Sequence, residues 1–291
     1  MTLVRDALQS NGVSPQYLEL EITESAVMQD PQRAMDLLRE LKQIGVRIAL
    51  DDFGTGYSSL NYLKRFPIDV VKIDQSFVRD ISSDAQDMAI TRAVIAMAHS
   101  LKHQVIAEGV ETPAQFKVLR RHRCDQIQGY LFSRPLPPDE FSRLLATGIA
   151  LPPSIAGSEE DLLPTLLLVD DEECVLSAFK RLFRRDGYRV LTATSAAQAF
   201  ELLAMHTVQV IISDHRMPIL DGTEFLSRVK GMYPNTVRLV LSGYTEINTV
   251  TNAVNQGGIY KFLTKPWDDE LLQGHVRDAF MFHASKRVVE A

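Results

Sequence analysis

The sequence predicts an α/β protein with two domains, a partial (βα) barrel followed by a doubly wound parallel sheet. A length of 291 residues fits about two domains of ordinary size. Short β-rich runs alternate with longer segments of helical period on both sides of one irregular stretch, which is typical of βα units and parallel sheets. In both halves several of the β-rich runs end in acidic residues. These observations set the fold class and direct attention to the ends of the strands.

The irregular stretch "ATGIALPPSIAGSEEDLLPT" covers residues 146–165, where Pro, Gly, Ser and acids replace the periodic apolar pattern. We therefore expect a linker at 149–163, between a first domain at 1–148 and a second domain at 164–291.

The composition, with 45% hydrophobic and 23% charged residues, is ordinary for globular protein. The N-terminus lacks the apolar core of a signal peptide, and no apolar run approaches the roughly 18 residues that span a bilayer. The sequence therefore predicts a cytoplasmic protein without a membrane partner. A net charge of −6 predicts no nucleic acid partner. Cys124 and Cys174, the two cysteines, lie far apart, so neither a disulfide framework nor a zinc site is expected.

Five β-rich runs are expected to form the strands of the first domain. They read "YLELEIT", "VRIALDDF", "DVVKID", "QVIAEGVE" and "DQIQGYLF". Between the first two, Asp30 is expected to cap a helix that starts at Pro31 and stops at Gly45. Its inward positions are Met35, Leu38, Leu41 and, at its end, Ile44.

Polar residues gather at or near the carboxyl ends of these strands. They are Glu21, Asp51, Asp52, Lys72, Asp74, Glu108 and Gln128. Neighbouring parallel strands of a barrel converge there on one mouth, where barrel enzymes keep their chemistry. A single acid at such a place is more often a helix cap or a solvated charge. Because polar residues recur at this position on five strands, a functional site is favoured over separate helix caps or solvated charges.

Asp51 and Asp52 are adjacent carboxylates, which repel each other and raise each other's pKa unless a cation lies between them. Together with Glu21 and Glu108 they supply hard oxygen ligands without histidine or thiolate, a set that suits Mg²⁺ or Mn²⁺ better than zinc. We therefore expect metal ions, bridged by Asp51 or Asp52, to keep the pair ionised.

Two further patterns carry little weight. The segment "GTGYSS" imitates a dinucleotide-binding fingerprint, but Ser59 replaces the third glycine and the preceding acids would repel a pyrophosphate. His99 and His103 are four apart on an expected helix but lack the glutamate of a zincin motif, so they are expected to be surface or packing residues.

Five separated motifs of the first half resemble the EAL-type cyclic-di-GMP phosphodiesterases over about residues 1–145. They are "ELEITES", "LDDFGTGYSSL", "VVKID", "VIAEGVET" and "DQIQGYLFSRPLP". The resemblance implies metal-dependent hydrolysis of one phosphodiester of cyclic di-GMP to pGpG on a (βα) barrel.

The same resemblance implies a role for each matching residue. Glu21 and Asp51 would bind a first metal ion, and Asp51 would bridge to a second. Asp52 and Glu108 would complete the second site. Three other residues would assist: Lys72 by orienting the attacking water, Gln128 by supporting the network of metal and water, and Glu24 by anchoring the "FGTGYSS" loop.

The sequence departs from this family at its start. The Glu-Ala-Leu tripeptide and an Asn on the next strand, both metal ligands in the family, would precede the matching region, and the chain begins twenty residues before Glu21. Five strand–helix units are recognisable where a closed barrel has eight. We therefore expect an open sheet edge, weak or absent hydrolysis, and self-association. A shortened gene model and a remnant that serves as a binding surface both stay open as explanations.

The second half is expected to contain apolar strands that end in polar residues. The strands read "TLLLVDDEE", "VQVIISDHRMP", "VRLVLSGY" and "IYKFLTKPW", and helical segments such as "CVLSAFKRLFRRDG" and "EINTVTNAVNQGG" separate them. The residues at the strand ends are Asp170, Asp171, Asp214, Ser242 and Lys265. In an open doubly wound sheet, ligands bind beyond these ends. Each residue alone could cap a helix or pair with a neighbour, so the set is what favours a site.

This set resembles the flavodoxin-like receiver domain of two-component response regulators over about residues 164–285. The resemblance implies Mg²⁺ held by Asp170, Asp171, Asp214 and the backbone carbonyl of Arg216, with Asp214 as phosphoacceptor. Three further residues complete the implied site: Lys265 would pair with the phosphoryl group, and Ser242 and Phe262 would act as switch residues. The phosphodonor would be a sensor histidine kinase.

We interpret the sequence as a response regulator in cyclic-di-GMP signalling, with a receiver coupled to an EAL-type domain that is expected to lack full activity. Two alternatives remain at this point. One is an active phosphodiesterase under receiver control, and the other is a non-catalytic adaptor that binds nucleotide or protein.

Overall fold

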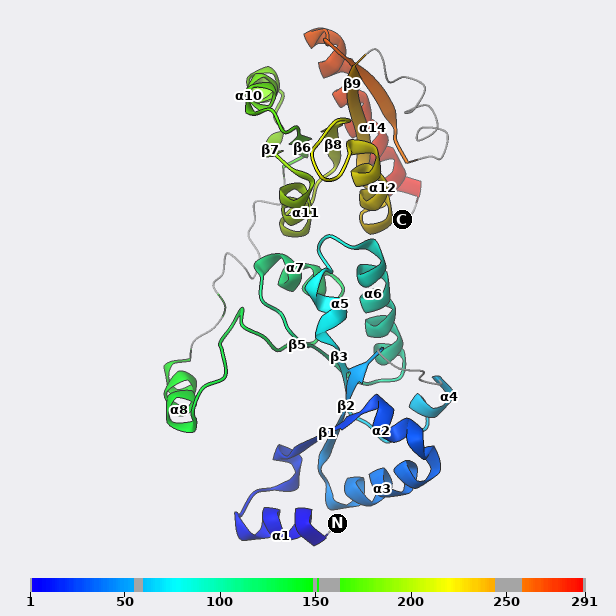
Figure 1. The fold of residues 1–291 in the computed structure, drawn as a ribbon, viewed down its shortest axis with the longest axis vertical. Helices are drawn as coiled ribbons and strands as arrows, with labels where there is room; N and C mark the ends of the chain where they lie inside the picture. The colour runs from blue at the N-terminus through cyan, green and yellow to red at the C-terminus, as the bar shows by residue number, and fades with distance from the viewer. Residues whose placement is uncertain (1, 55–59, 149–150, 152–162, 244–257, 290–291) are drawn as a thin grey trace. The chain divides into compact units, whose positions relative to one another are not determined.

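The computed structural model describes residues 2–54, 60–148, 151, 163–243 and 258–289. It divides into two compact units, one formed by Met1–Ile81 with Gln86–Leu151 and the other by Ser82–Ala85 with Pro152–Ala291. Each contains one five-stranded sheet with only parallel pairings (Figure 1). No helix among the described residues is both long enough and apolar enough to cross a membrane.

The sheet of the first unit has its strands in chain order, as expected for successive βα units of a partial barrel. The strands are β1 (Glu19–Thr23), β2 (Arg47–Phe53), β3 (Val70–Ile73), β4 (Gln104–Ala107) and β5 (Gln126–Ile127). All four residues of β3 are buried, which fits a central strand covered on both faces. The edges of this sheet are β1 and β5.

The helices of the first unit connect these strands. They are α1 (Thr2–Ser10), η1 (Pro15–Tyr17), α2 (Glu24–Gln29), α3 (Pro31–Ile44), α4 (Leu60–Leu63), α5 (Gln75–Arg79), α6 (Ala85–Ser100), α7 (Pro113–Arg121) and α8 (Pro138–Thr147). The signals that predict α3 are confirmed. The Asp30 side chain accepts a hydrogen bond from the Arg33 amide, and Gly45 ends the helix at a φ of 99°. Met35, Leu38 and Leu41 are buried, and Ile44 is half-buried.

The last expected strand of the first unit is much shorter than the pattern "DQIQGYLF" predicts, since β5 covers only two residues. After it, the chain turns against the segment that follows β4. The Val110 amide donates to the Gln128 carbonyl, and a Cβ on Gly129 would lie 2.2 Å from the Val110 carbonyl oxygen. A close approach between two backbones therefore ends the strand, and only glycine allows it.

The sheet of the second unit has the order β10-β9-β8-β6-β7, the doubly wound arrangement that the sequence predicts. Its strands are β6 (Thr165–Val169), β7 (Arg189–Ala193), β8 (Val210–Asp214), β9 (Val237–Gly243) and β10 (Lys261–Lys265). The described helices are α10 (Glu173–Leu182), η3 (Phe183–Arg185), α11 (Ala196–Met205), α12 (Gly222–Met232) and α14 (Asp269–Val289). The helix expected from "EINTVTNAVNQGG" lies almost entirely outside the described residues, as does most of the expected linker.

The core of the second unit joins the central strands to the helices that cover them. Every residue of β6 and β8 is buried. Leu176, Phe179 and Phe183 of α10 and η3 pack with Leu272 and Val276 of α14 in the same cluster. Two continuous apolar strands thus place the acids that end or follow them side by side, at the carboxyl ends of the strands.

Candidate functional sites

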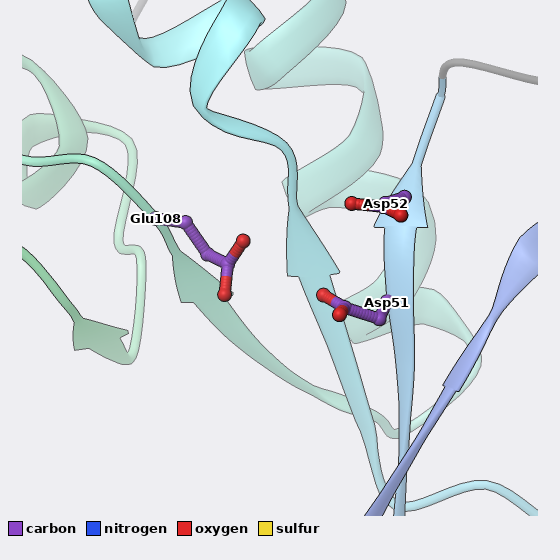
Figure 2. Close-up of side chains that lie close together, drawn as sticks. All are labelled: Asp51, Asp52 and Glu108. Atoms are coloured by element: carbon purple, nitrogen blue, oxygen red, sulfur yellow. The ribbon is translucent and has the colours of Figure 1, made fainter.

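The adjacent acids Asp51 and Asp52 lie in a β-bulge at the carboxyl end of β2. In a regular strand neighbouring side chains point to opposite faces. Here the pairing with β3 shifts register between Leu50 and Phe53, and Asp52 takes a φ of 55°. Figure 2 shows both carboxylates turned from β2 toward Glu108, across β3. The bulge therefore lets two consecutive acids serve one site.

Asp51, Asp52 and Glu108 form the first candidate metal centre. Each offers a carboxylate oxygen, and these oxygens lie within 4.8 Å of one another (Figure 2). Partial burial and the charges of Asp51 and Asp74 raise the pKa of Asp52, although Lys72 opposes this. Such a cluster of hard oxygen ligands suits a divalent cation.

Lys72 of β3 stands at the centre of this cluster and is only 3% exposed. Its Nζ lies 2.6 Å from Glu108, 2.8 Å from Glu21 and 3.1 Å from Asp51. Burial alone would lower the pKa of Lys72, but the bonds to the three carboxylates outweigh it and raise this pKa well above its usual range. The ammonium group thus supplies a fixed positive charge among the acids.

Glu21 lies outside the group of three converging carboxylates and is reached through Lys72. Its side chain is 51% exposed, whereas that of Glu108 is 19% exposed. Asp74, which the sequence shows only as a polar strand end, lies close enough to raise the pKa of Asp52. It also caps α5 by accepting from the Ser76 amide.

Glu24 and Gln128 flank the cluster in different ways. Glu24 is 1% exposed and accepts a hydrogen bond of 2.9 Å from the Gly54 amide, at the start of the "GTGYSS" segment. Residues 55–59 of that segment lie outside the described residues. Gln128 is exposed and lines, together with Glu108, a cavity of about 900 Å³.

The histidines of the sequence take no part in this cluster. His99 pairs with Asp125 at 2.9 Å, and Asp125 also accepts from the Val105 amide near the start of β4. This contact lies toward the amino ends of the strands, away from the carboxylates.

Asp170, Asp171 and Asp214 form the second candidate metal centre. Asp170 follows β6, and Asp214 ends the neighbouring strand β8, so two buried parallel strands deliver them to the same edge. Oxygens of all three lie within 4.8 Å of one another, with Asp171 exposed. The Glu172 amide donates to Asp170 and fixes this carboxylate at the turn into α10.

Lys265 at the end of β10 joins two of these acids. Its Nζ lies 2.7 Å from Asp214 and 3.0 Å from Asp170. Burial and the charge of Asp214 raise the pKa of Asp170, although the Glu172 amide and Lys265 oppose this. Burial would lower the pKa of Lys265, but its bonds to both acids raise it instead.

The remaining expected residues of the second site lie on neighbouring elements. Ser242 is 1% exposed in β9, directly beside Thr264 of β10 in the strand register. Phe262 is half-buried in β10, and Arg216 is exposed in the segment after Asp214. The structure therefore places Ser242 and Arg216 near the strand ends that carry the acids, and Phe262 three residues before Lys265 in β10.

Two features escape the sequence reasoning. The bulge at Asp51 depends on pairing with β3, which no local pattern reveals. The strand β7 is not among the runs expected for the second half, although the β-branched residues of "RVLTATS" indicate it.

Comparisons with known proteins match the two halves separately. The EAL domain family matches residues 1–135, and the response regulator receiver domain family matches residues 166–277. The "Cyclic di-GMP phosphodiesterase NbdA" of Pseudomonas aeruginosa is 52% identical over 134 residues, which are 46% of this chain and 17% of that protein. The "Signaling protein YkoW" of Bacillus subtilis is 48% identical over 143 residues, 49% of this chain and 18% of that protein.

A solved structure described as "PaMucR Phosphodiesterase, c-di-GMP complex" is 44% identical, with a TM-score of 0.47 over 47% of this chain and 56% of that one. The chain spans about a fifth or less of the length of the curated relatives named above. By the two family matches and the two folds, the chain carries an EAL domain over residues 1–135, followed by a response regulator receiver domain over residues 166–277.

Proposed function

We propose that this protein is a response regulator in cyclic-di-GMP signalling and that its receiver domain accepts a phosphoryl group on Asp214. One observation supports this assignment above the others: Lys265 bridges Asp170 and Asp214 at the edge of a buried parallel sheet, with Asp171 beside them. A sensor histidine kinase is the proposed phosphodonor.

The residues at this edge fit a divalent cation, because they offer converging carboxylate oxygens. Asp170, Asp171 and Asp214, with the backbone carbonyl of Arg216, would hold Mg²⁺. The ion would offset the negative charge of an approaching phosphoryl group.

The chain's own side chains supply the rest of the reaction. A carboxylate oxygen of Asp214 attacks phosphorus, the bond from phosphorus to the donor breaks, and the acyl phosphate forms. Lys265 then pairs with the new phosphoryl oxygens. Ser242 donates a hydrogen bond to one of them, and Phe262 turns inward as the switch residue.

Phosphorylation is tested with acetyl phosphate and Mg²⁺, followed by intact-mass analysis. The wild type is expected to gain one acid-labile phosphoryl group, and Asp214→Ala is expected to gain none. Asp278→Ala, which alters an exposed acid on α14, is the matched control and should label normally. Equal labelling of Asp214→Ala and the wild type would contradict the assignment.

For the EAL domain, we propose that Asp51, Asp52 and Glu108 bind Mg²⁺ or Mn²⁺ and that Glu21 contributes to a second ion bridged by Asp51. The ions would stabilise charge on a phosphodiester undergoing hydrolysis. Lys72 orients the attacking water, and Gln128 supports the network of metal ions and water. Glu24 holds the loop that starts at Gly54. The convergence of three carboxylates, two of which pair with the buried Lys72, supports this proposal.

We further propose that the polypeptide of residues 1–291 hydrolyses cyclic di-GMP slowly. Four carboxylates are too few to fill the coordination of two metal ions with protein ligands. Negative charge that stays uncompensated in the transition state costs several kcal/mol, which lowers the rate about a thousandfold or more. Chromatography of the reaction is expected to show little pGpG in either metal. Rapid formation of pGpG that is lost in Asp51→Ala would instead support an active phosphodiesterase.

A further inference from the structure

Four cations lie close together at the end of α10 and in η3 of the receiver domain. They are Lys180, Arg181, Arg184 and Arg185, here called the α10 basic patch. All four are exposed. The apolar residues of the same segment, Phe179 and Phe183, point into the core. The cations therefore occupy the outward face of a segment fixed by its buried side.

The α10 basic patch has no partner in the described part of the chain. None of its four side chains forms an ion pair or a side-chain hydrogen bond with any described residue. The adjacent acid, Asp186, accepts a hydrogen bond from the side chain of Gln273 on α14, forms no ion pair with the patch among the described side chains, and offsets at most one of its four charges. Such a group of uncompensated charges is unusual in a chain with a net charge of −6.

Helix electrostatics explain only part of this pattern. Cations in the last turn of a helix interact favourably with its dipole, which accounts for Lys180 and Arg181. Arg184 and Arg185 lie beyond the helix end, in η3. Four like charges within six residues repel one another unless an anion approaches them.

The patch is separate from the phosphorylation site. The helix α10 starts after Asp170 at the carboxyl edge of the sheet and runs back along it, over about 15 Å for its ten residues. The chain then enters β7 at Arg189, which is paired with Thr165 at the start of β6. The patch therefore lies toward the opposite edge of the sheet from the three acids.

The geometry points to an acidic segment of a partner protein as the ligand of the α10 basic patch. Arginine binds carboxylates through two parallel hydrogen bonds, and three of the four residues are arginines. A long polyanion such as nucleic acid would also meet the field of the whole chain, which is negative. A short acidic segment meets only the local charge, within a Debye length of about 10 Å.

A membrane surface fits the patch less well. No large hydrophobic side chain is exposed between residues 164 and 218, all of which the structure describes. The segment that carries the patch, α10 with η3, therefore lacks exposed apolar residues of its own that could anchor it in lipid.

The test measures binding of a fluorescein-labelled oligoglutamate peptide to the full chain by fluorescence anisotropy at low salt. Binding is expected to weaken steeply as salt is added. The double variant Arg181→Glu/Arg185→Glu is expected to bind at least tenfold more weakly. Its matched control, Arg33→Glu/Arg143→Glu, makes the same change in net charge at exposed arginines of the first unit and should bind as the wild type does.

Labelling by acetyl phosphate reports whether each variant is folded, since the patch lies away from Asp214. Single-stranded oligothymidylate and phosphatidylserine vesicles serve as competing probes. Absence of peptide binding by the wild type, or equal losses in both double variants, would overturn the proposal. Patch-dependent binding of oligothymidylate or vesicles that is tighter than peptide binding would also overturn it, because the ligand would then be of another class.

Discussion

At the scale of single residues, each cluster of carboxylates contains a lysine that offsets part of its negative charge. Lys72 contacts Glu21, Asp51 and Glu108, and Lys265 contacts two acids of the receiver. Lys72 comes from the strand between the two that carry Asp51 and Glu108, whereas Lys265 comes from β10, which β9 separates from the acid-bearing strand β8. In both sheets, the strand order places a cation among anions. The sequence could predict that these acids and lysines lie at the ends of strands, because they stand at the ends of apolar runs. It could not predict which acids each lysine joins.

Removing Lys72 should therefore destabilise the first unit. Lys72→Met leaves the half-buried carboxylates of Asp51 and Glu108 without their cation, which costs about 3 kcal/mol of unfolding free energy at neutral pH. The raised pKa of Lys72 means that its contribution is fully present below the ordinary lysine pKa and is lost only as the pH rises above that value.

Urea unfolding followed by circular dichroism measures this loss. The gap between Lys72→Met and the wild type should narrow when Mn²⁺ is added, because the metal replaces the missing charge. It should also narrow as the pH rises above the ordinary lysine pKa, where the contribution of Lys72 is lost. Lys64→Met, at an exposed lysine, is the control and should unfold as the wild type does. A pH-independent gap would contradict the electrostatic explanation.

Single elements of the EAL domain are fixed by contacts that local sequence does not contain. The helix α3 was predictable because its cap, its first proline, its apolar positions and its final glycine are all local. The bulge at Asp51 and the short β5 were not, because the first depends on register with β3 and the second on contact with Val110. Local sequence signals thus predict which strands carry the acids, whereas the pairing between strands determines the direction of their side chains.

The contact between Gly129 and Val110 gives a prediction for the two segments that carry Glu108 and Gln128, after β4 and after β5. In Gly129→Ala the added Cβ would strike the Val110 carbonyl, so the two segments must separate, at a cost of about 2 kcal/mol or more. Metal binding at Glu108 should weaken as well. Gly274→Ala on α14 is the comparison, because no positive φ is required there and the added Cβ would meet only the Arg277 side chain, at 3.8 Å. Thermal unfolding measures the loss of stability, and calorimetric titration with Mn²⁺ measures the loss of metal affinity. Equal Mn²⁺ affinities of Gly129→Ala and the wild type would argue against a link between this backbone contact and the metal site.

At the scale of the whole molecule, two parallel sheets use the same arrangement for two proposed reactions. Both deliver acids to the carboxyl ends of buried strands and add a lysine from another strand of the same sheet. The repulsion between adjacent acids is thereby offset in both units, and a divalent cation can enter by taking over part of the lysine's role. The two clusters lie in separate folding units, so we expect their metal ions to bind independently.

The chain's single tryptophan makes this independence measurable. Trp267 follows Lys265 by two residues, and its ring lies 4.5 Å from that of Phe179 on α10, the helix that starts beside Asp170. Mg²⁺ binding in the receiver should draw Lys265 away from the acids and alter the surroundings of this ring. We expect a saturable change in tryptophan emission that Asp171→Asn weakens and Asp51→Asn leaves unchanged. Loss of the change in Asp51→Asn would show that the two metal sites are coupled across the chain.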